Sequence, residues 1–137
     1  MICKEYNVAR EDFQNAGKVS SEIKKLLNSL MIPSPILRRI AVACYEAEIN
    51  MIIHSYGGVI KLLMDDEDIT LIFEDIGPGI EDIEKALEKG YSTASVKARE
   101  LGFGAGMGLY NIKRMADEFD LNSRANDKTI LTIKFKV

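Results

Sequence analysis

The chain has 137 residues, 47% of them hydrophobic and 28% charged, with a formal net charge of -3. This size and composition are typical of one soluble globular domain, expected over 1–137, and exclude a disordered or fibrous chain. The near balance of 18 basic and 21 acidic residues argues against direct nucleic-acid binding, because an extended nucleic-acid groove needs clustered Lys and Arg.

The first part of the chain predicts a short strand and two helices. Ile2 to Val8 has the weak pattern of a strand, and apolar side chains recur at helical spacing from Arg10 to about Leu30. Ser34 suits the N-cap of a second helix, and Pro35 suits its first position. We expect this second helix to end at about Ser55, before a pair of glycines.

The middle of the chain predicts a hairpin and a short helix. Val59 to Met64 and Ile69 to Phe73 have the composition of strands and flank an acidic cluster, Asp65 to Asp68, which we interpret as a solvated turn. Asp82 to Glu88 resembles a short helix. The stretch from Gly90 to Gly108 has little apolar periodicity, and a loop of that length in a compact domain is usually functional or mobile.

The end of the chain predicts a helix from Leu109 to about Phe119, then strands near Leu121 to Arg124 and Thr129 to Val137. Because strands come in adjacent pairs and do not alternate strictly with helices, the order predicts an α+β fold. We expect a two-layer sandwich, with helices covering one face of a mixed, mostly antiparallel sheet.

Several kinds of chemistry are excluded by residue counts. Cys3 and Cys44 lack metal-ligand spacing and are expected to be free thiols. His54 is the chain's one histidine, which excludes a multi-His metal site and argues against a Ser-His-Asp centre. The longest apolar runs, such as Ile40 to Cys44, are far shorter than the ~20 residues of a membrane helix, and the charged N-terminus does not resemble a signal peptide. We therefore expect a cytoplasmic protein without membrane contact.

Polar residues interrupt the apolar second helix in a regular way. Glu46, Asn50 and His54 are four residues apart and form one slanted stripe, whereas Glu48 lies elsewhere and is expected to face solvent. An Asn carbonyl oxygen is a suitable Mg²⁺ ligand, and Glu46, one turn away, is placed to accept a proton. A structural hydrogen-bond network is the alternative for Glu46 and Asn50, and we expect His54 to be structural.

A carboxylate follows the second strand of the predicted hairpin. Asp75 is followed by Gly77 and Gly79, and glycines let the backbone come close to a flat ligand. The exocyclic amine of adenine would donate to this carboxylate, whereas guanine would present an acceptor oxygen there. A tight turn without a ligand is the alternative for the same residues.

A third stretch has glycine at every second position, from Gly102 to Gly108, and leads into a helix. Such a stretch exposes backbone N–H groups at a helix N-terminus and favours phosphate; a flexible loop without a ligand is the alternative. Polar residues upstream of it are candidates for the terminal phosphate: Ser92, Thr93, Lys97 and Arg99.

In order and spacing these stretches resemble the nucleotide site of the Bergerat-fold (GHKL) ATPases. Glu46 to Asn50 resembles the N box, Asp75 to Gly79 the first glycine box and Gly104 to Gly108 the second. Thr129 resembles the late threonine that helps to hold the adenine-binding Asp. Within the family, the likeness is strongest to small bacterial switch kinases and anti-sigma factors of the RsbT, RsbW and SpoIIAB type.

The resemblance implies ATP and Mg²⁺ as cofactors. It implies Glu46 as the group that orients or deprotonates the acceptor, and Asn50 as the metal ligand. An Arg that RsbW-like sequences carry before the second glycine box is replaced here by Phe103 or Gly104, so Lys97 or Arg99 is expected to substitute for it. The remaining nucleotide contacts are expected from Asp75, Gly77, Gly79, Ser92, Thr93, Gly104, Ala105, Gly106, Met107, Gly108 and Thr129.

The resemblance further implies an ATP-dependent serine/threonine protein kinase in a partner-switching circuit. Its expected partners, besides ATP and ADP, are a small antagonist protein and a sigma factor, and a homodimer is a further candidate. A nucleotide-gated binding module without phosphotransfer and a plain ATPase are the alternatives. Lys128 departs from the family pattern, which has Gly before the late threonine.

Overall fold

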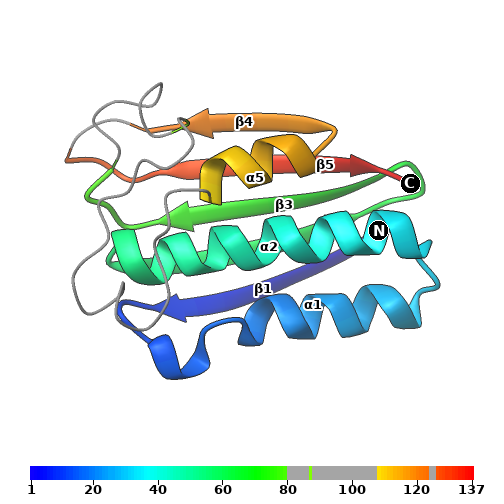
Figure 1. Ribbon diagram of the computed structural model, residues 1–137, viewed down its shortest axis with the longest axis horizontal. Helices are drawn as coiled ribbons and strands as arrows, with labels where there is room; N and C mark the ends of the chain where they lie inside the picture. Colours follow the sequence, from blue (N-terminus) through cyan, green and yellow to red (C-terminus); the bar gives the residue numbers. More distant parts are fainter. Residues whose placement is uncertain (80–86, 88–107, 124–125) are drawn as a thin grey trace.

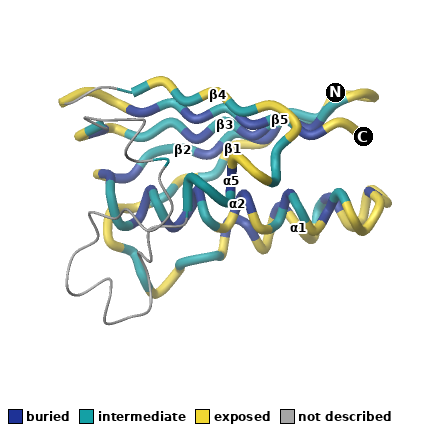
Figure 2. Tube along the Cα trace, turned by 45° about the horizontal axis from the view of Figure 1, so that its top comes forward, coloured by how far each residue is buried: buried dark blue, intermediate teal, exposed yellow. Residues whose placement is uncertain are grey.

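An antiparallel sheet forms one layer of the protein, and helices cover one of its faces (Figures 1 and 2). The computed structural model describes residues 1–79, 87, 108–123 and 126–137. The sheet has five strands in the order β1-β2-β3-β5-β4. The elements in chain order are β1 (Ile2–Ala9), the 3-10 turn η1 (Phe13–Asn15), α1 (Lys18–Ser29), α2 (Ser34–His54), β2 (Gly57–Met64), β3 (Asp68–Asp75), α5 (Gly108–Met115), β4 (Glu118–Asn122) and β5 (Ile130–Lys136).

The α+β two-layer prediction is confirmed, as is the hairpin of β2 and β3. Every strand pair in the described part of the chain is antiparallel, so the sheet there is not mixed. None of the described helices is long and apolar enough to cross a membrane. Cys3 is exposed and Cys44 is buried, and both are free thiols as predicted.

The core lies between the helices and the inward face of the sheet. Alternate strand residues such as Ile60, Leu71 and Ile133 are fully buried, as the period of two along a strand requires. Ile23 of α1 and Ile40 of α2 pack against them in the same cluster. None of the described helices covers the other face of the sheet (Figure 2). Along β2, β3 and β5 half-buried residues lie between the buried ones, whereas the edge strands β1 and β4 contain no buried residue.

Several predicted boundaries are wrong, and each has a local cause. The first helix begins at Lys18 and not at Arg10, because Phe13–Asn15 forms a separate 3-10 turn before it. Pro33, and not Ser34, occupies the N-cap of α2. The predicted short helix over 82–88 lies outside the described residues apart from Leu87.

The last helix was predicted to reach Phe119, but α5 ends at Met115. The Arg39 guanidinium donates to the Met115 carbonyl oxygen at 2.9 Å. The Asp117 N–H donates to the Lys134 carbonyl oxygen at 2.9 Å, so the chain there already pairs with β5. Phe119 is therefore a β4 residue, although its apolar spacing also fits a helix.

Glu48 joins α1 to α2 and is buried, with 1% of its surface exposed; the prediction that it faces solvent is wrong. Its Oε2 accepts from the N–H groups of Gly17 at 3.1 Å and Val19 at 3.3 Å, and its Oε1 accepts from the Ser20 N–H at 2.9 Å. The first turn of a helix leaves these donors unpaired and favours negative charge. The carboxylate of one helix thus caps the N-terminus of the other.

Removal of this cap should destabilise the fold. We expect Glu48→Ala to lower the free energy of unfolding by about 2–4 kcal/mol, because three N–H donors lose a charged acceptor. Glu48→Gln should lose less, since one acceptor oxygen remains. Urea denaturation measures both, with exposed Glu22→Ala on α1 as a control expected to stay within about 0.5 kcal/mol. An unchanged midpoint for Glu48→Ala would contradict the capping role.

Candidate functional site

The predicted site residues that the structure describes lie in two clusters. One lies between α2 and α5 and contains Glu46, Asn50 and Gly108; the other lies where β3 ends, before β5 begins, and contains Asp75, Gly77, Gly79 and Thr129. The remaining predicted residues lie outside the described part of the chain: Ser92, Thr93, Lys97, Arg99, Gly104, Ala105, Gly106 and Met107.

In the first cluster, the Asn50 carboxamide lies directly against Gly108, the first residue of α5. A Cβ at position 108 would lie 2.8 Å from Nδ2 and 2.9 Å from Oδ1 of Asn50, so only glycine leaves this side chain in place. The contact puts a half-buried amide oxygen beside the N-terminus of a helix. Such a neutral oxygen donor suits Mg²⁺, and a helix N-terminus suits phosphate.

One turn earlier on α2, Glu46 forms a side-chain hydrogen bond with Asn111 of α5. Burial raises the pKa of the Glu46 carboxyl, and the Asn111 hydrogen bond partly opposes this. Asn111 is three residues after Gly108, so the pairs Asn50–Gly108 and Glu46–Asn111 follow one antiparallel helix–helix seam. His54 continues the stripe at the end of α2, where burial lowers the pKa of its imidazole.

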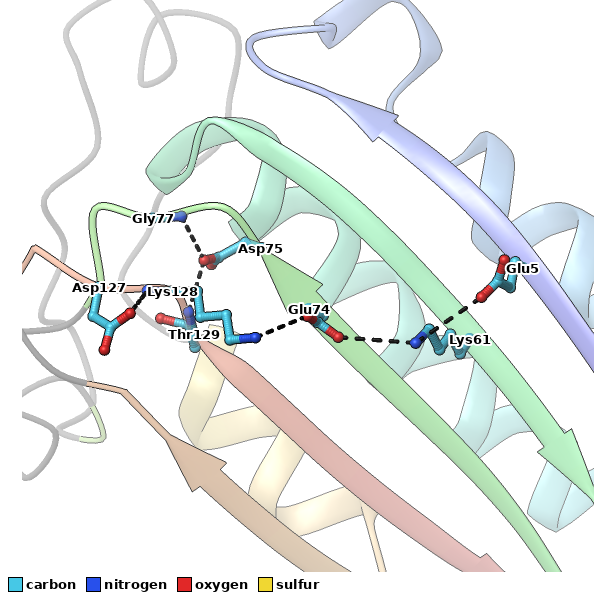
Figure 3. Close-up of polar contacts among 8 residues, drawn as sticks. All are labelled: Glu5, Lys61, Glu74, Asp75, Gly77, Asp127, Lys128 and Thr129. Atoms are coloured by element: carbon cyan, nitrogen blue, oxygen red, sulfur yellow. Dashed lines mark hydrogen bonds and ion pairs between the residues drawn. The ribbon is translucent and has the colours of Figure 1, made fainter.

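The second cluster orients the Asp75 carboxylate (Figure 3). Oδ1 accepts from the Thr129 N–H at 2.8 Å and from the Gly77 N–H at 3.0 Å. The Asp75 N–H in turn donates to the Thr129 carbonyl oxygen at 3.0 Å. Among the described residues, none donates a hydrogen bond to Oδ2. One carboxylate oxygen is thus fixed, and the other can accept from a ligand.

Burial raises the pKa of the Asp75 carboxyl, and the two N–H donors at Oδ1 partly oppose this shift. The Thr129 side chain is buried and its hydroxyl hydrogen-bonds to the Ser123 hydroxyl. Thr129 therefore holds Asp75 through its backbone, a role that any non-proline residue could perform, while its hydroxyl is directed toward Ser123.

The two clusters are tied together where α2 ends. The Tyr56 N–H donates to the Gly77 carbonyl oxygen at 2.9 Å, and the Ile76 N–H donates to the Gly57 carbonyl oxygen at 3.0 Å. A Cβ on Gly58 would lie 2.7 Å from the Asp75 Cα and 2.9 Å from the Met51 Cε. Met51 follows Asn50, so both clusters lie at the same end of the molecule, at the tip of β3 (Figure 1).

A cavity elsewhere has no part in this arrangement. It has a volume of about 150 Å³ and lies between β1, α1 and α2. None of the predicted site residues lines it; its lining residues are Asn7, Val8, Ala9, Asp12, Asn15, Lys18, Val19, Glu48 and Ile52.

Comparison with known proteins agrees with the motifs. The family model for the histidine kinase-like ATPase domain matches residues 9–135. The serine/threonine-protein kinase RsbT of Bacillus subtilis (strain 168) is 37% identical over 95 residues, which cover 66% of this chain and 65% of RsbT. The match thus spans just under two thirds of that relative. An anti-sigma F factor of Clostridium novyi (strain NT) is 33% identical over 104 residues, 72% of this chain and 69% of that protein.

A solved structure shares the fold. A chain in the crystal structure of the SiaB-SiaC complex from Pseudomonas aeruginosa aligns with 100% of this chain and 90% of its own length, with a TM-score of 0.53. The sequence identity is 9%, so this likeness concerns architecture alone.

The environment of Asp75 predicts an unusual titration. Its carboxyl should titrate above the ordinary value of 3.8, whereas Asp117, which accepts the Lys136 N–H, should titrate below 3.8. Carbon-13 NMR of the two carboxyl groups measures both midpoints, and an Asp75 midpoint at or below 3.8 would contradict the burial.

The raised pKa of Asp75 also determines how the stability of the fold depends on pH. Because the folded chain binds the Asp75 proton more tightly than the unfolded chain, protonation of this group favours folding. The unfolding free energy of the native chain should therefore rise relative to that of Asp75→Asn as the pH falls through the raised pKa.

Proposed function

Because the chain belongs to the histidine kinase-like ATPase family, we propose that it binds ATP with Mg²⁺ and acts as a serine/threonine protein kinase in a partner-switching circuit. The observation that carries this proposal is the Asp75 carboxylate, whose Oδ1 is held by Thr129 and Gly77 and whose Oδ2 accepts from none of the described residues. The names of the relatives RsbT and anti-sigma F factor support the regulatory role.

Asp75 would read the purine ring. An ionised carboxylate is an acceptor only, so its Oδ2 can pair with the exocyclic amine of adenine but would face the oxygen of guanine. The site is half-buried, which strengthens such a hydrogen bond relative to one in water. Gly77 and Gly79 would bring the backbone close to the ring.

Asn50 and the glycine stretch would hold the phosphate end. The Asn50 carboxamide is kept in place because Gly108 has no side chain. Its oxygen is a suitable ligand for Mg²⁺, which also takes waters and phosphates as ligands. The bound ion would neutralise phosphate charge. We propose that Ser92, Thr93 and the glycine stretch from Gly104 to Gly108 contact the phosphates, through backbone N–H groups within the stretch.

Glu46 would orient or deprotonate the acceptor hydroxyl of the protein substrate. Burial raises its pKa, which makes the ionised carboxylate a stronger base, and the Asn111 hydrogen bond would orient the carboxyl. Lys97 or Arg99 would place positive charge at the terminal phosphate. Since phosphoryl transfer is mostly positioning and charge neutralisation, these cations and Asn50 would matter more than the base.

The proposed protein substrate is a small antagonist protein that presents a Ser or Thr, and a sigma factor is the proposed second partner. A homodimer is a further proposal.

The anti-sigma F relatives favour one alternative function, a binding module whose affinity for its partner depends on the bound nucleotide. Incubation with ATP labelled at the terminal phosphate separates the functions. Label on a candidate antagonist supports the kinase, free phosphate supports a plain ATPase, and neither, with nucleotide-dependent partner affinity, supports the module.

Loss of the purine-reading carboxylate should weaken nucleotide binding. We expect Asp75→Ala to reduce ATP binding by about 1–3 kcal/mol, because the adenine amine loses its acceptor. Titration calorimetry measures the change, and exposed Asp66→Ala in the β2–β3 turn is the matched control. Unchanged ATP affinity in Asp75→Ala would contradict the role of Asp75.

Glu46 should affect turnover and not binding. Glu46→Ala should retain ATP affinity while slowing transfer about 10²–10⁴-fold, the usual effect of removing a general base. Single-turnover assays with labelled ATP give the rate, and Glu67→Ala in the β2–β3 turn serves as a control. Full turnover in Glu46→Ala would remove the base from the mechanism.

A further inference from the structure

An ion pair joins β3 to the segment before β5 on the open face of the sheet (Figure 3). The Lys128 Nζ lies 3.2 Å from Oε1 of Glu74, and the Lys61 Nζ of β2 lies 3.9 Å from Oε2 of the same carboxylate. Lys61 also lies 4.0 Å from Oε1 of Glu5 on β1. Glu74 is therefore held from both sides, by a neighbouring strand and by the segment that leads into β5.

The ion pair links the same two chain segments as the Asp75 hydrogen bonds. Glu74 directly precedes Asp75, and Lys128 directly precedes Thr129. The regular β3–β5 pairing ends at Glu74 and Ile130, so the Thr129 N–H that holds Asp75 lies one step beyond the ladder. Consecutive strand residues point to opposite faces, which lets the Lys128–Glu74 pair hold these segments without entering the nucleotide side.

Hydrogen bonds of Asp127 and Lys128 hold the segment before β5 from its other end. The Lys128 N–H donates to Oδ1 of Asp127 at 2.8 Å, and the Asp127 N–H donates to the Pro78 carbonyl oxygen at 3.2 Å. Lys128 thus lies between a contact to Pro78 and a contact to Asp75. The Lys128–Glu74 pair is a side-chain contact that ties this residue directly to β3.

We propose that Lys128 and Glu74 are positioning residues for purine recognition. By holding the segment before β5 against the end of β3, they keep the Thr129 N–H on Oδ1 of Asp75 and leave Oδ2 directed at the ligand. This inference rests on the proposed nucleotide binding. The pair is partly exposed, with 53% of the Lys128 side chain and 34% of the Glu74 side chain accessible. Its effect on affinity is therefore modest, about threefold, and is screened by salt.

Binding of adenosine and of ATP to Lys128→Met tests the proposal. Adenosine carries no phosphate. If Lys128 is a positioning residue, the variant should therefore bind adenosine and ATP with equally reduced affinity, about threefold at low ionic strength and less at high salt. Glu74→Gln should have a similar effect, the double variant should be no weaker than either single one, and Lys128→Arg should restore binding. Lys134→Met is the matched control, since Lys134 lies 3.9 Å from Glu118 on the same face of the sheet and away from Asp75; it should bind both ligands normally.

Each contrary result has a distinct meaning. If the native chain binds neither ligand, the proposed function fails and the inference fails with it. If the native chain binds both and Lys128→Met binds them equally well, the inference alone is overturned. Weaker binding of ATP with unchanged binding of adenosine also overturns it, because Lys128 would then act only by attracting phosphate. Thermal unfolding of Lys128→Met and Lys134→Met at similar midpoints shows that affinity and not folding has changed.

Discussion

The hydrogen bond from the Thr129 N–H to Oδ1 of Asp75 is the contact on which the site depends. It extends the pairing of β3 and β5 beyond the last ladder pair and fixes one carboxylate oxygen with a backbone donor. Because Gly77 shares the same oxygen, neither of these donors occupies the second oxygen, which accepts from no other residue in the described part of the chain. Burial of a charged group is unfavourable, and a ligand that donates to Asp75 would offset part of that penalty.

Helix α2 connects this carboxylate to the rest of the domain. It presents different polar side chains to its two neighbours: Glu48 caps α1, while Glu46 and Asn50 face α5. The same helix then leads through Gly57 and Gly58 into β2, next to Asp75. A shift of α5 along α2 would therefore change the surroundings of Asn50 and Glu46 together, and α2 connects both of them to the end of β3 that carries Asp75.

Sequence patterns predicted those features that depend on neighbouring residues in the chain. Alternation located the β2–β3 hairpin, and glycine spacing located Gly108, whose contact with Asn50 gives the motif a steric reason. Glu48 was wrongly predicted to be exposed. A carboxylate on an apolar helix is expected to face solvent, and its partners here, N–H groups at the start of α1, are not apparent from the sequence. The Glu46–Asn111 bond also depends on how α2 and α5 pack. The end of α5 depends on Arg39, a residue far away in the sequence, so apolar spacing alone extended the helix too far.

Paramagnetic broadening of NMR signals by ATP loaded with Mn²⁺ measures most directly whether Asn50, Asp75 and Gly106 contact one nucleotide. We predict the strongest broadening at the Asn50 carboxamide and the Gly106 amide, weaker broadening at Asp75, and none at the Asp65 turn at the far end of β3. Replacement by Mg²⁺ should restore all signals and leave Asp75 shifted by the purine. Broadening that spares Asn50, or an Asp75 signal that is indifferent to ATP, would contradict a shared nucleotide site.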